Sequence, residues 1–412
     1  MIIKPAERTL EVHEYYFSAK LKEVASISDS RISKGLFPII NMGIGSPDGM
    51  PPMSAIDKLR DIASKKDVHA YQSYTGTPQL REAFASWYQR FYGVDLDPSS
   101  QIQPLTGSKE GIMLISLAFL NPGDKVLIPD PGYPTYVSAS KMVGAIPVPY
   151  DLLEVNDWKP DFEALEDMNL EGVKMMWTNY PNMPTGGKAD MELYERLIAF
   201  GKKHGIMICN DNPYSFILND KPLSILNADG AMDCALELNS LSKAHNMSGW
   251  RIGMVAASAQ VISVILKVKS QMDSGIFRPL QLAAVEALSQ GKQWYESLNE
   301  EYAIRKEAAS KLFQIIGANY DKDCAGLFLW GRLDETNPLA QGAMPDGSIP
   351  MKKDMKKTLG ERVSDSLLYI YGIFVAPGFI FGKNGNDYIR ISLCLPSRVY
   401  MEAADLLSLK QL

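Results

Sequence analysis

The sequence predicts an α/β fold whose larger domain holds a mainly parallel sheet between two layers of helices. In the middle of the chain, short apolar runs such as KVLIPD and IMICND alternate with longer stretches in which apolar residues recur every three or four positions. Toward the carboxyl end the pattern changes to a long helical stretch and then to three short strand-like runs. The alternation is typical of parallel sheets covered on both faces, which bind ligands at the carboxyl ends of their strands.

The chain is expected to divide into an arm and two domains. Residues 1–45 form an N-terminal arm, and residues 46–286 form the large domain. Residues 287–412 then complete, with the arm, a small α+β domain. A helical stretch over about residues 280–317 links the two domains, and residues 334–357 are predicted to be a surface excursion.

The elements follow from local patterns taken in order. Residues 11–34 indicate a helix, and PIINMG indicates a short strand before a Gly- and Pro-rich loop. SAIDKLRDIASKK and QLREAFASWYQRFYG carry apolar residues at helical spacing, so they predict two amphipathic helices around the loop AYQSYTGTP. Further helices are predicted at GIMLISLAFL, YPTYVSASKMVG and DMELYERLIAFGKKHG, and strands at QIQPL, KVLIPD, KMMWTNYP, IMICND, ALELNSLS, AGLFLWGRL, LLYIYGIFVAPG and YIRISLCL.

Composition narrows the class of protein. A net charge of -6 over 412 residues, with no basic block, argues against a nucleic-acid partner. No apolar run approaches the ~20 residues that cross a bilayer, so no membrane span is expected. The four cysteines lie far apart in apolar runs, which indicates buried free thiols in a reducing, cytoplasmic setting. The histidines are scattered, so no metal site is predicted.

Polar or aromatic residues follow five of the predicted strands. TGSKEG stands at a helix start, where free backbone N–H groups suit a phosphate, although Ser108 could equally be a plain N-cap. Tyr133 could cover a flat ring or belong to the core, and NMPTGG could be a simple connection. Asp211 ends an apolar strand, where a carboxylate needs a cation, a donor or a capping role. Lys243 and Arg251 lie eight residues apart in SLSKAHNMSGWRIG, among serines and glycines.

One ligand explains this set. A flat, cationic, phosphorylated heterocycle needs a phosphate cradle, a stacked ring, a carboxylate for its ring nitrogen and a lysine for its aldehyde. Pyridoxal phosphate is such a molecule, and each of these four needs is met by one of the residue groups above. Lys243 would then form the Schiff base, and the planar guanidinium of Arg251 would bind the phosphate.

The same motifs resemble the class I/II, fold-type I pyridoxal-phosphate aminotransferases of the aspartate aminotransferase superfamily, over nearly the whole chain. The matches include NMGIGSPD, YQSYTGTPQLREA, TGSKEG, NPGDKVLIPDPGYPTY, PTGG, DNPY, SLSKAHNMSGWRIG and VAPGFIFG with YIRISL. The resemblance implies an aminotransferase that exchanges an amino group between an L-amino acid and a 2-oxo acid by a ping-pong mechanism. It also implies a homodimer.

The resemblance assigns roles to individual residues. Lys243, Asp211 and Tyr214 would be catalytic, with Asp211 on the ring nitrogen and Tyr214 on the ring oxygen. Arg390 would bind the substrate carboxylate with help from the backbone of Gly45. The cofactor would be held by Gly107, Ser108, Lys109, Tyr133, Asn182, Asp211, Tyr214, Ser240, Ser242, Lys243 and Arg251, and by Tyr71 reaching a neighbouring subunit.

One position departs from the family pattern. Where the family carries an asparagine that donates to the ring oxygen, PNMPTG places Met183, and Asn182 stands one residue earlier. We expect Tyr214 to be the main donor to that oxygen unless Asn182 turns inward.

The reaction and the substrate remain open at this point. The same cofactor serves C–S lyases and other eliminating enzymes, and a non-catalytic regulator is a further alternative. The regulator is disfavoured because the first forty residues show no helix-turn-helix pattern and are not basic. Lys267, Lys269 and Arg278 are candidates for binding a second substrate carboxylate. Alanine, branched and aromatic substrates are equally open.

Overall fold

The computed structural model describes residues 3–12, 14–341 and 356–409. The larger of its two parts is built on a seven-stranded sheet with the order β2-β8-β7-β6-β5-β3-β4. Six of these strands point in one direction, with β7, β6, β5, β3 and β4 paired in parallel, and only β8 of the seven runs the other way, antiparallel to both β2 and β7. The strands are β2 (Ile102–Leu105), β3 (Lys125–Asp130), β4 (Ile146–Asp151), β5 (Val173–Asn179), β6 (Met207–Asp211), β7 (Ala235–Ser240) and β8 (Gly253–Ala257). The predicted mainly parallel α/β sheet is confirmed.

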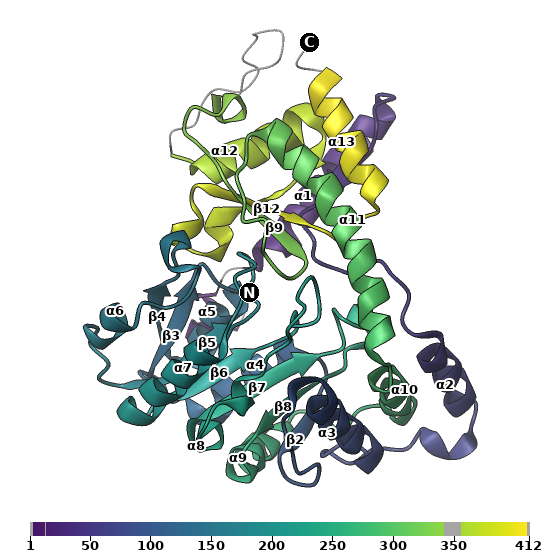
Figure 1. Cartoon of the computed structure of the whole chain (residues 1–412), viewed down its shortest axis with the longest axis vertical. Helices are drawn as coiled ribbons and strands as arrows, with labels where there is room; N and C mark the ends of the chain where they lie inside the picture. The colour runs from purple at the N-terminus through teal and green to yellow at the C-terminus, as the bar shows by residue number, and fades with distance from the viewer. Residues whose placement is uncertain (1–2, 13, 342–355, 410–412) are drawn as a thin grey trace.

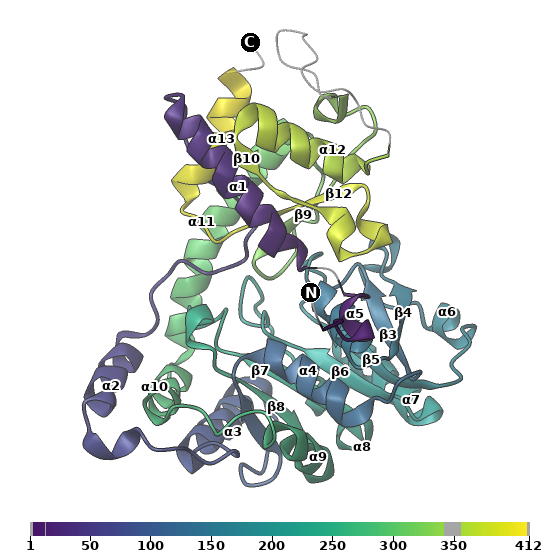
Figure 2. The ribbon, with the colours of Figure 1, turned by 180° about the vertical axis from the view of Figure 1, so that it is seen from behind.

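Helices cover both faces of this sheet because its strands alternate between two apolar clusters. On β3, Val126 and Ile128 pack into one cluster and Leu127 into the other. Helix α7 (Met191–His204) lies on the face seen in Figure 1, and α4 (Ser108–Phe119) lies on the face seen in Figure 2. The remaining helices of this part are α2 (Met53–Ala63), α3 (Pro78–Tyr92), α5 (Pro134–Met142), α6 (Phe162–Glu166), α8 (Ala231–Cys234), α9 (Ala259–Lys269) and α10 (Arg278–Leu288).

The smaller part has its own short sheets. One has the antiparallel order β11-β12-β9, and in the other β1 pairs with β10 in parallel. Helix α11 (Lys292–Ile316) runs from the larger part into the smaller one, where α1 (Tyr16–Ser33) crosses the opposite side (Figures 1 and 2). The other elements are β1 (Ile40–Asn41), β9 (Phe328–Arg332), β10 (Ile373–Phe374), β11 (Ala376–Pro377), β12 (Tyr388–Ser392), α12 (Leu359–Ser366) and α13 (Ser397–Leu409). The boundaries at residues 46 and 286 stay a prediction.

Three local expectations differ from the structure. The predicted strand LLYIYGIFVAPG begins with a π-helical turn, Leu367–Tyr371, and only β10 and β11 follow it. The predicted helix over 280–317 is broken between α10 and α11, where Gly291 is the extended N-cap of α11. The pattern of IPVPYD gave no indication of β4, an edge strand in which prolines are tolerated because one side needs no ladder bonds. Most of the expected surface excursion, residues 342–355, lies outside the described residues.

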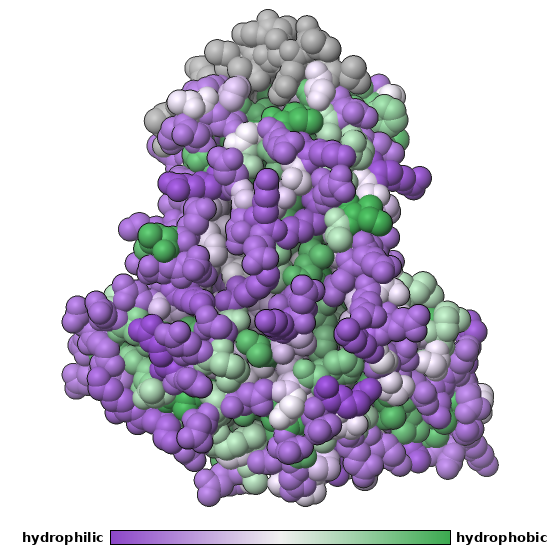
Figure 3. All heavy atoms as spheres, viewed as in Figure 1, coloured by the Kyte–Doolittle hydropathy of each residue, from purple (hydrophilic) through white to green (hydrophobic). Residues whose placement is uncertain are grey.

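The surface is mainly hydrophilic, as the composition of an ordinary globular protein leads one to expect. On the face shown in Figure 3, hydrophilic residues cover most of both parts and apolar residues form small separate groups. Among the described residues, no helix combines the length and the apolar character needed to cross a membrane.

The core of the smaller part depends on α11, which supplies a fully buried Leu312. We expect Leu312→Ala to lower the free energy of unfolding by about 2–5 kcal/mol, because the substitution leaves a cavity in packed surroundings. Ile304→Ala on the same helix is the matched control, since Ile304 is 55% exposed. Urea unfolding of both variants tests this, and equal effects would contradict the packing described here.

Candidate active site

A cavity of about 520 Å³ lies where the carboxyl ends of the parallel strands face the smaller part. Its walls come from distant segments, including the arm, the start of α4, the end of β6, the loop after β7, and β12. Of the residues proposed from the sequence, its lining contains Gly45, Ser108, Lys109, Tyr133, Asp211, Tyr214, Ser240, Ser242, Lys243, Arg251 and Arg390. Gly107, Asn182 and Tyr71 do not line it.

One end of the cavity has the chemistry of an anion site. Gly107 precedes α4 with a φ of +81°, so the free N–H groups of the first helical turn are available there. The Arg251 guanidinium lies so close that a Cβ on Gly107 would come within 2.3 Å of its Nη2. Ser240 and Ser242 add hydroxyls, with Ser240 Oγ donating to Ser242 Oγ at 2.7 Å. A phosphate fits this donor set.

Asp211 closes β6 as a buried carboxyl. The Tyr136 hydroxyl donates to Oδ2 at 3.0 Å, and within the described chain Oδ1 has no hydrogen-bond partner. Burial raises the pKa of Asp211 to about 7, against the lowering effect of the Tyr136 hydrogen bond. A protonated ring nitrogen aimed at Oδ1 would satisfy this group, so the residue fits a pyridine-type cofactor.

Lys243 lines the same cavity as Asp211 and lies on the loop after β7. Its Nζ donates to the Gly45 carbonyl at 2.5 Å and lies 5.9 Å from the centre of the Tyr214 ring. Burial is the main cause that lowers the pKa of Lys243 to about 8, and the nearby cations Arg390 and Arg251 lower it further. At pH 7 about a tenth of this amine is therefore unprotonated and nucleophilic, far more than for a free lysine. Burial also raises the pKa of Tyr214, which keeps that phenol a donor.

Arg390 on β12 is a buried cation without a carboxylate partner among the described residues. Nη2 donates to the Gly43 carbonyl at 2.7 Å, and Nη1 contacts Met183 Sδ at 3.2 Å. The rings of Phe328 and Phe381 lie 4.0 and 4.5 Å from its guanidinium carbon. Burial lowers its pKa to about 10, so a bound carboxylate would supply the charge partner that this site lacks.

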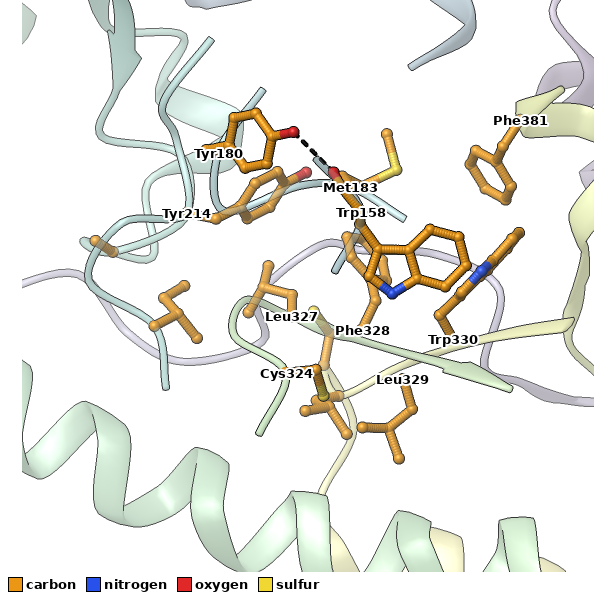
Figure 4. Close-up of a cluster of buried hydrophobic side chains, with 14 of the residues drawn as sticks. Trp158, Tyr180, Met183, Tyr214, Cys324, Leu327, Phe328, Leu329, Trp330 and Phe381 are labelled. Atoms are coloured by element: carbon orange, nitrogen blue, oxygen red, sulfur yellow. Dashed lines mark hydrogen bonds between the residues drawn. The ribbon is translucent and has the colours of Figure 1, made fainter. Parts of the chain in front are cut away.

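Met183, not Asn182, faces the cavity. Asn182 Oδ1 accepts from Thr185 Oγ1 at 2.8 Å, which directs that side chain into its own turn. Met183 lies in the apolar cluster of Figure 4, together with Tyr214, Phe328 and Phe381. The same picture shows Tyr180, whose hydroxyl donates to the Trp158 carbonyl at 2.7 Å and so ties this segment to the one that holds Trp158.

Tyr71 is the third proposed residue that does not line the cavity, and some residues that do line it were missed. Tyr71 is 91% exposed and does not line this cavity, so its expected role toward a neighbouring subunit stays a prediction. Tyr136, Phe328 and Phe381 were not singled out from the sequence. Tyr136 follows Tyr133 by three residues and begins the same helix, which was the available signal; the two phenylalanines lie in apolar runs that resemble ordinary core. In the part of the chain that the structure describes, no group of three or more His, Cys, Asp or Glu side chains is placed to bind a metal ion.

Comparison with known proteins agrees with this geometry. The model of the family "Aminotransferase class I and II" matches residues 38–407. The LL-diaminopimelate aminotransferase of Oleidesulfovibrio alaskensis is 35% identical over 404 residues, covering 97% of each chain. That of Aquifex aeolicus is 34% identical over 401 residues, covering 95% of this chain and 98% of the other. The substrate-bound BacF structure from Bacillus subtilis superposes with a TM-score of 0.88 at 30% identity, covering 100% of this chain and 98% of that one.

The chain therefore belongs to the class I and II aminotransferases. It is a pyridoxal-phosphate-dependent transaminase that acts on an amino acid and a 2-oxo acid, and the resemblance found in the sequence is confirmed. Its fold is the fold-type I aminotransferase fold.

The anion site yields a test with a matched control. Gly107→Ala is expected to weaken pyridoxal phosphate binding at least about tenfold, because the new Cβ would displace the Arg251 guanidinium. Gly123→Ala also places a side chain at positive φ, +90°, but meets nothing within 4 Å. Fluorescence titration of both apoenzymes with the cofactor compares them, and equal affinities would show that the Gly107 contact is unimportant.

Proposed function

We propose that Lys243, Asp211 and Tyr214 form the reacting centre of this transaminase. The support is their convergence on one cavity, with a lysine whose pKa is lowered to about 8 and a buried carboxyl whose Oδ1 lacks a partner. Ser108, Lys109, Ser240, Ser242 and Arg251 would hold the phosphate with the backbone at Gly107. Tyr133 would cover one face of the ring.

The chemistry divides between the cofactor and the chain. Pyridoxal phosphate, when bound, supplies an aldehyde that condenses with amines and a cationic ring that withdraws electrons from the neighbouring carbon. Asp211 Oδ1 would keep the ring nitrogen protonated, and the Tyr214 hydroxyl would donate to the ring oxygen. Lys243 Nζ, once free, would remove the proton from Cα of the amino acid. The amino group stays on the enzyme when the first 2-oxo acid leaves, which gives ping-pong kinetics.

Arg390 would bind the α-carboxylate of the amino acid through its planar fork. Its Nε has no partner among the described residues, and Nη1 has only the weak acceptor Met183 Sδ. A carboxylate would therefore replace poor contacts with charge-assisted hydrogen bonds. The backbone around Gly45 lies beside the same space.

The substrate side chain is proposed to have a substantial apolar portion. Tyr15, Phe17 and Ile44 line the cavity, and among the described residues Asp211 is the one carboxylate in that lining. LL-diaminopimelate is the first amino donor to test, because the relatives carry that name and its methylene chain would contact these residues. An aromatic L-amino acid is the second candidate, since the part of the chain that the structure describes adds no further acidic side chain to the lining for a distal ammonium group.

We also infer a cytoplasmic homodimer. The support is that Tyr71 is 91% exposed and that Met50, Met272 and Phe277 are 66%, 54% and 40% exposed, so large side chains are available for a subunit contact. Tyr71 would reach the phosphate of the second subunit. The four free cysteines suit a reducing compartment. Light scattering and cell fractionation test the two statements, and a monomer would remove the role given to Tyr71.

The half-reaction tests the proposed function. Purified enzyme is mixed with single L-amino acids, including LL-diaminopimelate and phenylalanine, without any 2-oxo acid. We expect the visible cofactor band to be lost stoichiometrically, fastest with the physiological donor, and Lys243→Ala to abolish this change because no amine remains to move the Cα proton. Absorption spectra give the rates. Persistent colour with release of ammonia would identify a lyase instead.

A further inference from the structure

The loop between β1 and α2, residues 43–48, contacts both cations that face the substrate. The Gly43 carbonyl accepts from Arg390 Nη2 at 2.7 Å, and the Gly45 carbonyl accepts from Lys243 Nζ at 2.5 Å. One short segment therefore holds the guanidinium and the amine at the same time. A shift of the loop would change the position of both groups relative to a bound amino acid.

The loop itself fits tightly against aromatic rings. A Cβ on Gly45 would lie 2.2 Å from the Phe328 ring, and one on Gly43 would lie 2.5 Å from the Phe374 ring. These contacts require glycine, which is the residue that loses most conformational entropy on ordering. A glycine-containing loop in such a position needs an anchor outside the cavity.

Arg305 supplies that anchor from the middle of α11. Its Nη1 donates to Asp48 Oδ1 at 2.6 Å, and its Nη2 lies 3.4 Å from Asp48 Oδ2. Nη1 also lies 3.3 Å from the Leu393 carbonyl, three residues beyond Arg390 on the chain. Nε donates to Glu301 Oε1 at 2.9 Å on the same helix. One guanidinium thus joins α11, the loop and the end of β12.

We propose that Arg305 and Asp48 are positioning residues: their ion pair fixes loop 43–48 so that its two carbonyls orient Lys243 and Arg390. The inference rests on the proposed roles of those two residues. The Arg305 side chain is 9% exposed and the Asp48 side chain 36%, so the pair is less screened by water than a surface pair. Loss of Arg305 leaves Asp48 without a cation among the described residues, and loss of Asp48 leaves Arg305 with Glu301 alone; either change removes the contact that ties the loop to α11.

If the Arg305–Asp48 ion pair had a purely structural role, the expected results would differ. It would change the stability of the fold and leave the affinity for carboxylates and the reactivity of Lys243 unchanged. A positioning pair changes both, because the Gly43 carbonyl orients the group that binds the carboxylate and the Gly45 carbonyl stabilises the protonated amine. The two readouts need no transamination.

The experiment compares Asp48→Asn, Arg305→Met and the double variant with wild type. In the apoenzyme, calorimetry measures the affinity for 3-phenylpropionate, a carboxylate without an amine, and an amine-specific reagent measures the pH at which Lys243 becomes reactive. In the loaded enzyme, kcat and KM are measured for the best amino donor. We expect a loss of kcat/KM of about 10- to 100-fold, weaker binding of 3-phenylpropionate, and Lys243 reactivity at lower pH. The double variant should be no worse than the worse single one.

Glu301→Gln is the matched control, because it removes the exposed partner of Arg305 Nε and leaves the loop contact intact. It should behave as wild type in all three measurements. Arg305→Lys keeps the charge without the planar fork, so it should recover part of the loss and gives a variant that folds if the others do not.

Two results would overturn the inference. One is a lower melting temperature in Asp48→Asn with unchanged carboxylate affinity and unchanged Lys243 titration. The other is an effect of Glu301→Gln equal to that of Asp48→Asn. Failure of the wild type to react with any amino acid would instead count against the proposed function, and the two apoenzyme measurements would still decide the role of the ion pair.

Discussion

Burial of ionisable groups with few polar partners is the constraint on which the rest of this structure depends. Asp211 and Arg390 are buried and Lys243 is half-buried where the two parts of the chain meet, and burial is the largest cause of each pKa shift. Such groups are costly to the fold unless a ligand completes them. The fold tolerates the free-energy cost of these groups because apolar clusters pack against the seven-stranded sheet and against the sheet of the smaller part, and these contacts stabilise the chain.

The two parts of the chain contribute different halves of the chemistry. The larger part provides the carboxyl, the lysine and the anion site, all at strand ends or a helix start. The smaller part provides Arg390 and the rings of Phe328 and Phe381. Loop 43–48 lies between them and is held by α11, the helix that runs through both parts (Figure 1). In the roles proposed for Arg390 and Lys243, carboxylate binding and proton transfer are thereby linked through one backbone segment.

Much of the site was predictable because its residues follow strands, where parallel sheets expose their polar groups. TGSKEG, Asp211 and SLSKAHNMSGWRIG were found this way, since each interrupts an apolar run. Phe328 and Phe381 gave no such signal, because an apolar run looks the same whether it faces a cavity or a core. The π-helical turn at Leu367–Tyr371 was missed for a related reason: its apolar residues satisfy a strand pattern locally, and tertiary packing decided otherwise. The contact of Arg305 with Asp48 joins residues 257 positions apart, which no local pattern reveals.

The central claim is that Asp211 is a carboxyl prepared for a cationic ring nitrogen. Infrared difference spectroscopy of the apoenzyme over a pH series, with Asp211→Asn to identify the band, measures its ionisation directly. Because burial raises its pKa to about 7, the carboxyl should be mostly protonated at pH 6 in the apoenzyme and should become ionised at that pH when pyridoxal phosphate binds. A carboxyl already ionised at pH 5 without the cofactor, or one that stays protonated with it, would contradict the account.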